Sequence, residues 1–295
     1  MDTRFHPAIA KIKSGDLEGL KSLLEVDRSL ATDRSSVSHP TLLQCLALEA
    51  TDVPNRVELA KALVDAGAEI NEPLCACASI DNVAVGEFLL DAGAKVDGTG
   101  GWSPLEEALY WGNQKMIQLL LDRGARVQNL RTAAGLGGID LVRNFFTPEG
   151  QLKPEAGRID WPFGDPRRSN LNPKIKEELQ AKMDGWSENP IEIINNAFIY
   201  ACMGNHIEVA RFLLARGAEI NSIPAGFDYS GTGLHYAALR GHREMCDFLL
   251  EHGADRAIRD TKVGSLPSGW ANHGGHADLG DYLQPASLHQ TPQAN

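Results

Sequence analysis

The sequence predicts an all-α fold, a solenoid of about eight helix-turn-helix repeats with one proline-rich insertion. Three observations carry this prediction. A two-helix hydrophobic pattern recurs along the chain, a glycine-containing loop motif follows most copies of it, and most copies start roughly 31 to 36 residues apart. Because a repeat of this length cannot bury its apolar surface alone, neighbouring copies must stack.

The clearest copy covers residues 232–254 and reads TGLHYAALRGHREMCDFLLEHGA. Apolar residues recur at helical spacing in both of its halves, which predicts two short amphipathic helices. Gly241 separates the two helices, and Gly253 ends the second one. Glycine suits both places because it adopts the left-handed conformation of a helix C-terminus at the least cost.

Further copies begin at intervals along the chain. The starts are His6, Thr41, Glu72, Ser103, Gln128, Asn196, Thr232 and Leu266. The loop motif recurs as LVDAGA, LLDAGA, LLDRGA, LLARGA and LLEHGA. This pattern resembles the ankyrin repeat, whose signature combines T-P-L-H-x-A-A with a later L-L-x-x-G-A. The resemblance covers most of the chain and implies a stack of ankyrin repeats.

The repeats fall into two groups. Residues 1–146 contain repeats one to five, and residues 191–284 contain repeats six to eight. Residues 147–190 lack the pattern and hold six prolines, which predicts an inserted segment with one helix at Lys174–Met183. A badly decayed repeat is the alternative for this segment. The polar residues 285–295 are expected to form a disordered tail.

Three large aromatic residues distinguish the inserted segment from an ordinary linker. Trp161, Phe163 and Trp186 gain about 25 cal/mol per Å² when their apolar surface leaves water. We therefore expect the segment to pack against repeats five and six and to shape a site there. A flexible proline-rich loop is the alternative.

The charge balance limits the classes of partner. With 39 acidic and 28 basic side chains the net charge is −11, which argues against unaided binding to nucleic acid or an anionic membrane. A protein partner, favoured to be basic, or a neutral small ligand fits better. The sequence has no run of 18 apolar residues, and its first residues lack the apolar core of a secretory signal. We therefore expect no membrane span and a cytoplasmic location.

No motif in the sequence names a reaction, a metal or a cofactor. The five cysteines are odd in number, and the C-x-C pair Cys75 and Cys77 lacks further ligands at zinc-site spacing, so buried core cysteines are expected. His235 occupies the histidine position of the ankyrin signature, where the resemblance implies a loop-stabilising role. Structural roles are also expected for His206, His242 and His276, which stand in the glycine-histidine slot of the ankyrin signature, with Asn205 in the glycine position before His206.

The resemblance implies that a partner is held on the concave side of the stack, by loop tips and by exposed positions of the first helices. Aromatic residues and arginine, which dominate protein-binding hot spots, gather at or beside these positions. The candidate contact residues are Glu107, Tyr110, Trp111, Arg131, Tyr200, Met203, Tyr236, Arg240, Trp270 and His273. The alternative interpretation of Tyr200, Tyr236 and Trp270 is that they fill space between neighbouring first helices.

Two classes of function remain open. The first is a non-enzymatic protein-binding module that grips its partner in a concave groove, with no catalytic residue, no metal and no cofactor. The second is a small-molecule binding protein or an enzyme, with a pocket between the groove and the inserted segment. The absence of a phosphate loop, a nucleophile elbow or an H-E-x-x-H motif favours the first class.

Overall fold

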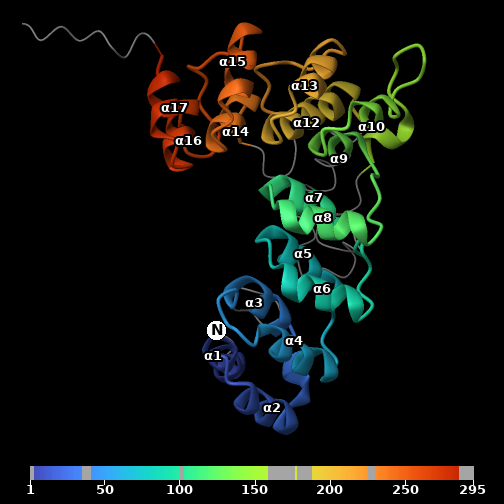
Figure 1. Ribbon diagram of the computed structural model, residues 1–295, viewed down its shortest axis with the longest axis vertical. Helices are drawn as coiled ribbons and strands as arrows, with labels where there is room; N and C mark the ends of the chain where they lie inside the picture. The colour runs from blue at the N-terminus through green and yellow to red at the C-terminus, as the bar shows by residue number, and fades with distance from the viewer. Residues whose placement is uncertain are drawn as a thin grey trace, which may run out of the picture. The chain divides into compact units, whose positions relative to one another are not determined.

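The computed structural model describes residues 3–34, 41–99, 103–158, 177, 188–224 and 230–285. These residues form 16 α-helices and three short 3-10 helices, and they contain no β-strand. A single β-bridge joins Phe146 and Leu152. The all-α fold that the sequence predicts is confirmed, and Figure 1 shows the helices following one another in pairs.

The contacts divide the described chain into two compact units. Of the described residues, those up to Arg126 form unit 1, and those from Val127 onward form unit 2. Each unit contains four helix pairs, and each helix pair corresponds to one repeat. Repeat five belongs to the same compact unit as repeats six to eight.

Unit 1 contains repeats one to four in two layers. The first helices α1, α3, α5 and α7 pack one against the next, and the second helices α2, α4, α6 and α8 do the same. Fully buried leucines such as Leu46, Leu63 and Leu74 make up its core. The helices are α1 (His6–Ser14), α2 (Leu17–Val26), α3 (Leu42–Glu49), α4 (Arg56–Asp65), α5 (Asn71–Ser79), α6 (Val83–Asp91), α7 (Pro104–Trp111) and α8 (Gln114–Asp122), with the 3-10 helices η1 (Thr3–Phe5) and η2 (Arg28–Ala31).

Unit 2 contains repeats five to eight. Its first helices α9, α12, α14 and α16 pack in that order, so repeats five and six are direct neighbours although the inserted segment separates them in the sequence. The helices are α9 (Leu130–Gly135), α10 (Ile139–Arg143), α12 (Pro190–Met203), α13 (Ile207–Leu214), α14 (Gly233–Leu239), α15 (Arg243–Glu251), α16 (Pro267–His273) and α17 (Ala277–Tyr282), with the 3-10 helix η3 (Pro154–Gly157).

The helix ends match the local signals in the sequence. Ser103 caps α7 with a capping box, accepting the backbone N–H of Glu106 at 3.1 Å, and Pro104 takes the first helical position. Gly241 and Gly253 adopt φ values of 70° and 94°, in the left-handed region that the sequence predicts for them. These two turns fix where each helix of repeat seven stops.

Helix α12 departs from the repeat pattern. The pattern places the start of repeat six at Asn196, but α12 begins at Pro190 and runs for 14 residues. The physical reason is a cap and a proline that precede the start of the repeat pattern in the sequence. The Asn189 side chain accepts the N–H of Ile191 at 3.1 Å, and Pro190 in the first turn costs the helix no hydrogen bond.

In unit 1, asparagines link each repeat to the one before it. Asn55, Asn82 and Asn113 each precede a second helix, α4, α6 and α8. Their side-chain amides donate to the carbonyl oxygens of Gly15, Ala47 and Ala78 at 2.9, 2.9 and 2.7 Å. These acceptors lie at or near the ends of the preceding first helices, where helical carbonyls lack an internal partner. The asparagines therefore join consecutive repeats by satisfying helix ends.

In unit 2, histidines stand at the same position. His206 and His242 precede α13 and α15, and their Nε2 atoms lie 2.9 Å from the carbonyl oxygens of Gly135 and Met203. A carbonyl oxygen only accepts, so each ring donates from Nε2. Gly135 and Met203 are the last residues of α9 and α12, the first helices of the preceding repeats. The structural role that the sequence predicts for these two histidines is confirmed.

The described start of the inserted segment folds back on unit 2. Leu152 bridges to Phe146, and η3 packs against α9 and α12. The guanidinium of Arg216 lies 5.0 Å from the Phe146 ring centroid and 4.4 Å from that of Phe212, so it joins the end of repeat five, to which Leu152 bridges, to α13. The predicted helix at Lys174–Met183 lies outside the described residues apart from residue 177. Trp161, Phe163, Trp186 and residues 286–295 of the tail also lie outside them.

Candidate partner-binding surface

The most exposed aromatic side chain in the described part of unit 1 is Trp111, at the end of α7. It is 57% exposed. Its indole N–H donates to Oε1 of Glu107, one helical turn earlier, at 2.8 Å. The half-buried Tyr110 ring stands edge-on to it, with ring centroids 5.3 Å apart and planes at 86°. These two contacts hold the indole in one orientation while leaving much of its surface open to solvent.

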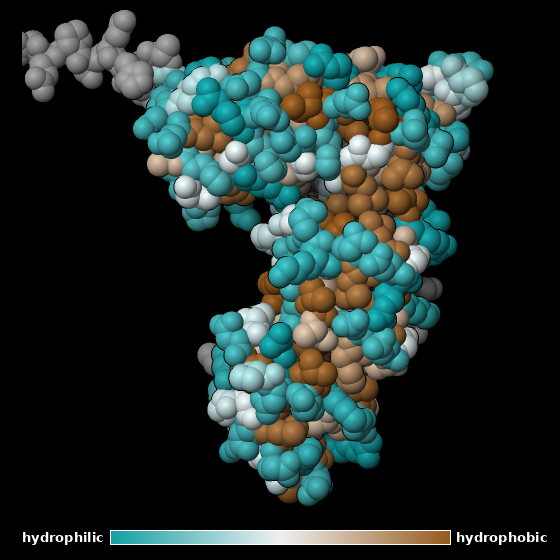
Figure 2. Space-filling model, in the orientation of Figure 1, coloured by the Kyte–Doolittle hydropathy of each residue, from teal (hydrophilic) through white to brown (hydrophobic). Residues whose placement is uncertain are grey.

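An apolar residue at the equivalent position of the preceding repeat extends this surface. Ile80 is the first residue after α5, and Trp111 is the last residue of α7. The two helices pack against each other. Ile80 is 37% exposed. We call Ile80, Glu107, Tyr110 and Trp111 the Trp111 surface. Figure 2 shows apolar residues reaching the surface between hydrophilic ones along α5 to α8.

The electrostatic environment beside this surface is acidic. Desolvation raises the pKa of the Cys75 thiol, and the carboxylates of Glu107, Glu72 and Glu69 raise it further. Arg34 forms an ion pair with Glu72 at 2.9 Å. Because its pKa lies above the usual range, the Cys75 thiol stays protonated at neutral pH, and a protonated thiol is a weak nucleophile.

The other cysteines are core residues, as the sequence predicts. Cys45, Cys77, Cys202 and Cys246 are buried, and none of the five cysteines, all of which the structure describes, forms a disulfide. Burial raises the pKa of Cys45 to about 11 and that of Cys77 to about 12. These buried thiols pack as small apolar side chains.

In unit 2, most of the candidate contact residues are buried. Tyr200 and Tyr236 are 1% and 5% exposed, and Met203 and Arg131 are buried as well. Tyr200 lies on α12 and Tyr236 on α14, two first helices that pack together. Both tyrosines therefore fill space within the stack of first helices, and a partner has no open route to their rings in this conformation.

Trp270 on α16 uses its indole N–H inside the unit. The N–H donates to Oδ2 of Asp260 at 3.0 Å, and the ring packs edge-on against His235 and Tyr236 with centroids 5.2 and 5.0 Å away. Asp260 is 4% exposed and also accepts three backbone N–H groups of its own loop, each at 2.8 Å. Trp270 thus ties the loop before α16 to the helix layer.

The pKa of Asp260 reflects this network. Burial alone raises the pKa of a carboxyl group, but the N–H groups of Val263, Trp270, Lys262 and Ser265 outweigh it and lower the pKa of Asp260 to about 2. The carboxylate is therefore ionised at every physiological pH. The repeat pattern does not single out Asp260, although an aspartate ten residues before a helix tryptophan was available as a signal.

Two candidate residues of unit 2 lie closer to the surface. His273, at the end of α16, is exposed. Arg240 is half-buried, and its guanidinium donates to the carbonyl oxygen of Met203 at 3.0 Å. The candidates thus separate by environment. Glu107, Tyr110 and Trp111 gather on one surface of unit 1, whereas the buried candidates of unit 2 take part in packing.

His235 has the loop-stabilising role that the family resemblance implies. It is fully buried, its Nδ1 accepts the N–H of Thr232 at 3.1 Å, and its Nε2 donates to the carbonyl oxygen of Ser265 at 3.2 Å. This arrangement requires a neutral ring with its proton on Nε2. Burial lowers the pKa of His235, which keeps the ring neutral.

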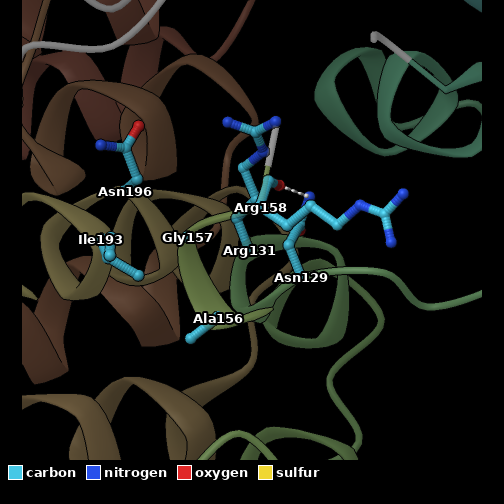
Figure 3. Close-up of a pocket in the computed structure, with 7 residues that line it drawn as sticks. All are labelled: Asn129, Arg131, Ala156, Gly157, Arg158, Ile193 and Asn196. Atoms are coloured by element: carbon cyan, nitrogen blue, oxygen red, sulfur yellow. Dashed lines mark hydrogen bonds between the residues drawn. The ribbon is translucent and has the colours of Figure 1, made fainter. Parts of the chain in front are cut away.

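A small pocket in unit 2 lies where the inserted segment leaves the repeats. Figure 3 shows Asn129 and Arg131 from α9 and its cap on one side of it, Ile193 and Asn196 from α12 on the other, and Gly157 of η3 between them. The amide of Asn129 donates to the carbonyl oxygen of Arg158 at 2.9 Å and so closes one wall.

This pocket is too small for most organic ligands. Its empty space is about 190 Å³ even when the part open to solvent is included, whereas pockets for small molecules usually measure roughly 300 to 1,000 Å³. In the described residues no group of three or more His, Cys, Asp and Glu side chains is arranged to hold a metal ion. None of the described helices is both long and apolar enough to cross a membrane.

Comparison with known proteins identifies the family. The family model for ankyrin repeats (3 copies) matches residues 46–130 and 175–260, which together make up more than half of the chain. Ankyrin repeat protein nuc-2 of Neurospora crassa is 26% identical over 296 residues, covering 93% of this chain and 27% of that protein. Ankyrin repeat and KH domain-containing protein mask-1 of Caenorhabditis elegans is 28% identical over 226 residues, covering 68% of this chain and 8% of that protein.

A shorter similarity leads to a third relative. Palmitoyltransferase ZDHHC13 of Mus musculus is 38% identical over 61 residues, which cover 21% of this chain and 10% of that protein. The chain spans less than a third of the length of each of these three relatives. The stacked helix pairs and the family match agree, and the chain belongs to the ankyrin-repeat family.

Proposed function

We propose that this chain is a protein-binding module that holds a segment of a partner protein across the first helices of unit 1, with the Trp111 surface as the main contact. Ankyrin repeats generally serve as protein-interaction modules. The observation that carries the proposal is the exposed Trp111 ring, held in place by Glu107 and Tyr110. Tryptophan is among the residue types most enriched in binding hot spots.

The energy available at Trp111 is large enough for a hot spot. Burying a tryptophan removes about 150 to 250 Å² from water, and a little more than half of the surface of Trp111 is still exposed. At about 25 cal/mol per Å², covering the exposed part contributes about 2 to 3.5 kcal/mol. Because the ring is already oriented, little side-chain entropy is lost when a partner covers it.

The alternative is a small-molecule site or an active site beside the inserted segment. The pocket of about 190 Å³ near Asn196 is the feature that such a function would use. It is smaller than usual ligand pockets, and its described lining holds two amides, two guanidinium groups and no carboxylate to act as an acid or base. The protein-binding proposal is therefore the better supported of the two.

Selection from a displayed library of random short peptides tests the proposal, and it does not require the natural partner to be identified first. Peptides are selected on the wild-type chain and counter-selected on the Trp111→Ala variant. We expect peptides that bind wild type saturably and lose affinity about tenfold or more on Trp111→Ala. Val26→Ala, which alters another exposed apolar residue of unit 1, is the matched control and should bind like wild type.

The selection can also contradict the proposal. Peptides that bind wild type and Trp111→Ala equally well would place the contact elsewhere. A set of selected peptides that fail on Val26→Ala as well as on Trp111→Ala would indicate general stickiness of apolar surface. Either result would remove the Trp111 surface as the partner site.

A further inference from the structure

We propose that the Trp111 surface recognises a cationic side chain, an arginine or a lysine of the partner segment, stacked on the Trp111 ring beside the Glu107 carboxylate. This inference rests on the proposed function and names the chemistry of the partner. Three observations support it: the fixed orientation of the indole and the Glu107 carboxylate beside it, the acidic residues on the first helices of unit 1, and the net charge of the chain.

The indole of Trp111 is prepared for stacking. Its N–H is already engaged by Glu107 at 2.8 Å, and the edge-on contact with Tyr110 supports one side. The remaining polar interaction that the ring can offer is through its π face, which attracts cations and does so best in tryptophan. The hydrogen bond also places the Glu107 carboxylate beside the ring, so that one ligand cation can meet both groups.

The surrounding charge favours a basic ligand over a neutral or acidic one. The carboxylates of Glu107, Glu72 and Glu69 all raise the pKa of the Cys75 thiol on α5, so the electrostatic environment of α5 and α7 is acidic. Arg34 pairs with Glu72 and offsets one of these charges. The whole chain carries a net charge of −11, so a basic segment is attracted, and a second copy of this chain is repelled.

Unit 2 contains an internal example of the proposed contact. The guanidinium of Arg243 lies 3.5 Å from the ring centroid of Tyr282 and also donates to the Asp247 carboxylate at 3.0 Å. An aromatic ring and a carboxylate therefore hold one arginine together in this protein. Trp111 and Glu107 present the same pair of groups at a surface.

A titration followed by nuclear magnetic resonance tests the inference. The chain has five tryptophans, and loss of one indole N–H signal in Trp111→Phe assigns that of Trp111. The probes are the capped tripeptides Ac-Gly-Arg-Gly-NH2 and Ac-Gly-Nle-Gly-NH2, in which norleucine supplies a similar stem without the charge. We expect the arginine peptide to shift the Trp111 signal saturably at millimolar concentration, and the shift to weaken with added salt. The norleucine peptide should shift it at least about tenfold less at equal concentration.

Glu107→Gln separates charge from geometry. Its amide oxygen still accepts the indole N–H, so the ring keeps its orientation while the negative charge is lost. We expect this variant to bind the arginine peptide about threefold or more weakly, with an unchanged melting temperature. Equal shifts with the arginine and norleucine peptides, or no effect of Glu107→Gln, would overturn the inference.

The two proposals fail in different ways. If the selected library peptides require Trp111 but carry no arginine or lysine, the proposed function stands and the cation inference falls. If the library yields no peptide that depends on Trp111, the proposed function falls, whatever the tripeptides do. A selected consensus that contains a basic residue and requires both Trp111 and Glu107 supports both proposals.

Discussion

Units 1 and 2 use tryptophan on their first helices in opposite ways. Trp111 donates its N–H to Glu107 on its own helix and stays 57% exposed. Trp270 donates to the buried Asp260 of the preceding loop, and its ring packs against Tyr236. The two tryptophans thus differ in the acceptor of their indole N–H. Glu107, on the same helix, holds the Trp111 ring at the surface, whereas Asp260, in a loop, joins the Trp270 ring to that loop. The position of each tryptophan within its repeat also affects how exposed the ring is.

Register explains why the rings differ. Three of the rings follow the start of their repeat by four residues, at a position on first helices that pack together. These residues are Tyr200, Tyr236 and Trp270. Trp111 and Ile80 follow the start of their repeat by eight residues, at the end of the first helix, where both side chains remain exposed. The same aromatic type therefore packs in one register and faces solvent in the other.

The largest expected effect is at Asp260. Asp260→Ala removes one charged acceptor from four N–H donors, so we expect the free energy of unfolding of unit 2 to fall by about 3 kcal/mol or more. Urea denaturation with hydrogen exchange of α14 and α16 measures it. Glu107→Ala, which removes the acceptor of the exposed tryptophan, should change the stability of unit 1 by less than about 0.5 kcal/mol. An equal loss of free energy of unfolding in Asp260→Ala and Glu107→Ala would contradict the proposed difference between the two tryptophans.

A smaller effect is expected where unit 1 links its repeats. Asn82 is 5% exposed and donates to the carbonyl oxygen of Ala47 at 2.9 Å. Asn82→Ala leaves that helix-end carbonyl without this donor, so we expect a loss of about 1 to 2 kcal/mol, measured as a lower urea midpoint. Asn82→His restores a donor and should recover part of the loss, because His206 and His242 make this contact in unit 2. A fully stable Asn82→Ala variant would show that the link contributes little.

The smallest expected effect is a difference in pH response. Burial lowers the pKa of His206, His235 and His242 below the ordinary value of 6.5. The unfolded chain therefore binds more protons in that range, and the stability from the neutral rings is complete above about pH 6.5 and is lost as the pH falls toward the lowered folded pKa. At His235 the new proton on Nδ1 would face the Thr232 N–H.

Hydrogen exchange measured by mass spectrometry at pH 7 and at about pH 5.5, corrected for intrinsic rates, tests this difference. We expect α12 to α15 to lose protection on acidification. The helices α4, α6 and α8, whose links are asparagines, should lose less. The double variant His206→Asn and His242→Asn should weaken the response of unit 2. A uniform loss across both units would contradict the assignment to histidine.

The sequence predicts the fold well because its signals are local. Ser103 and Thr232 cap first helices as the pattern requires, and Gly241 and Gly253 end helices in the left-handed region. A helix cap or a turn glycine acts within four residues, so the pattern contains all the information needed. The repeat pattern does not predict the early start of α12 at Pro190, because the cap of this helix lies outside the repeat template.

The candidate site is predicted less well because exposure depends on neighbouring repeats. The sequence leaves two interpretations of Tyr200 open, a partner contact or a residue packed between first helices, and the packing of α12 with α9 and α14 decides for the second. Trp270 looks like a contact residue until its indole N–H is matched with Asp260, ten residues earlier in a loop. An aromatic residue can contact either a partner or the rest of its own chain. The packing of neighbouring repeats decides which of the two it contacts.

The central claim is that Trp111 is a contact residue and Trp270 a structural one. The most direct test measures, for one selected library peptide, the Kd and the free energy of unfolding of wild type, Trp111→Ala and Trp270→Phe. The claim predicts that Trp111→Ala raises the Kd about tenfold and changes stability by less than about 0.5 kcal/mol. It predicts that Trp270→Phe, which lacks the N–H for Asp260, loses about 1 to 2 kcal/mol of stability and keeps the Kd. An unchanged Kd for Trp111→Ala together with a raised Kd for Trp270→Phe would contradict it.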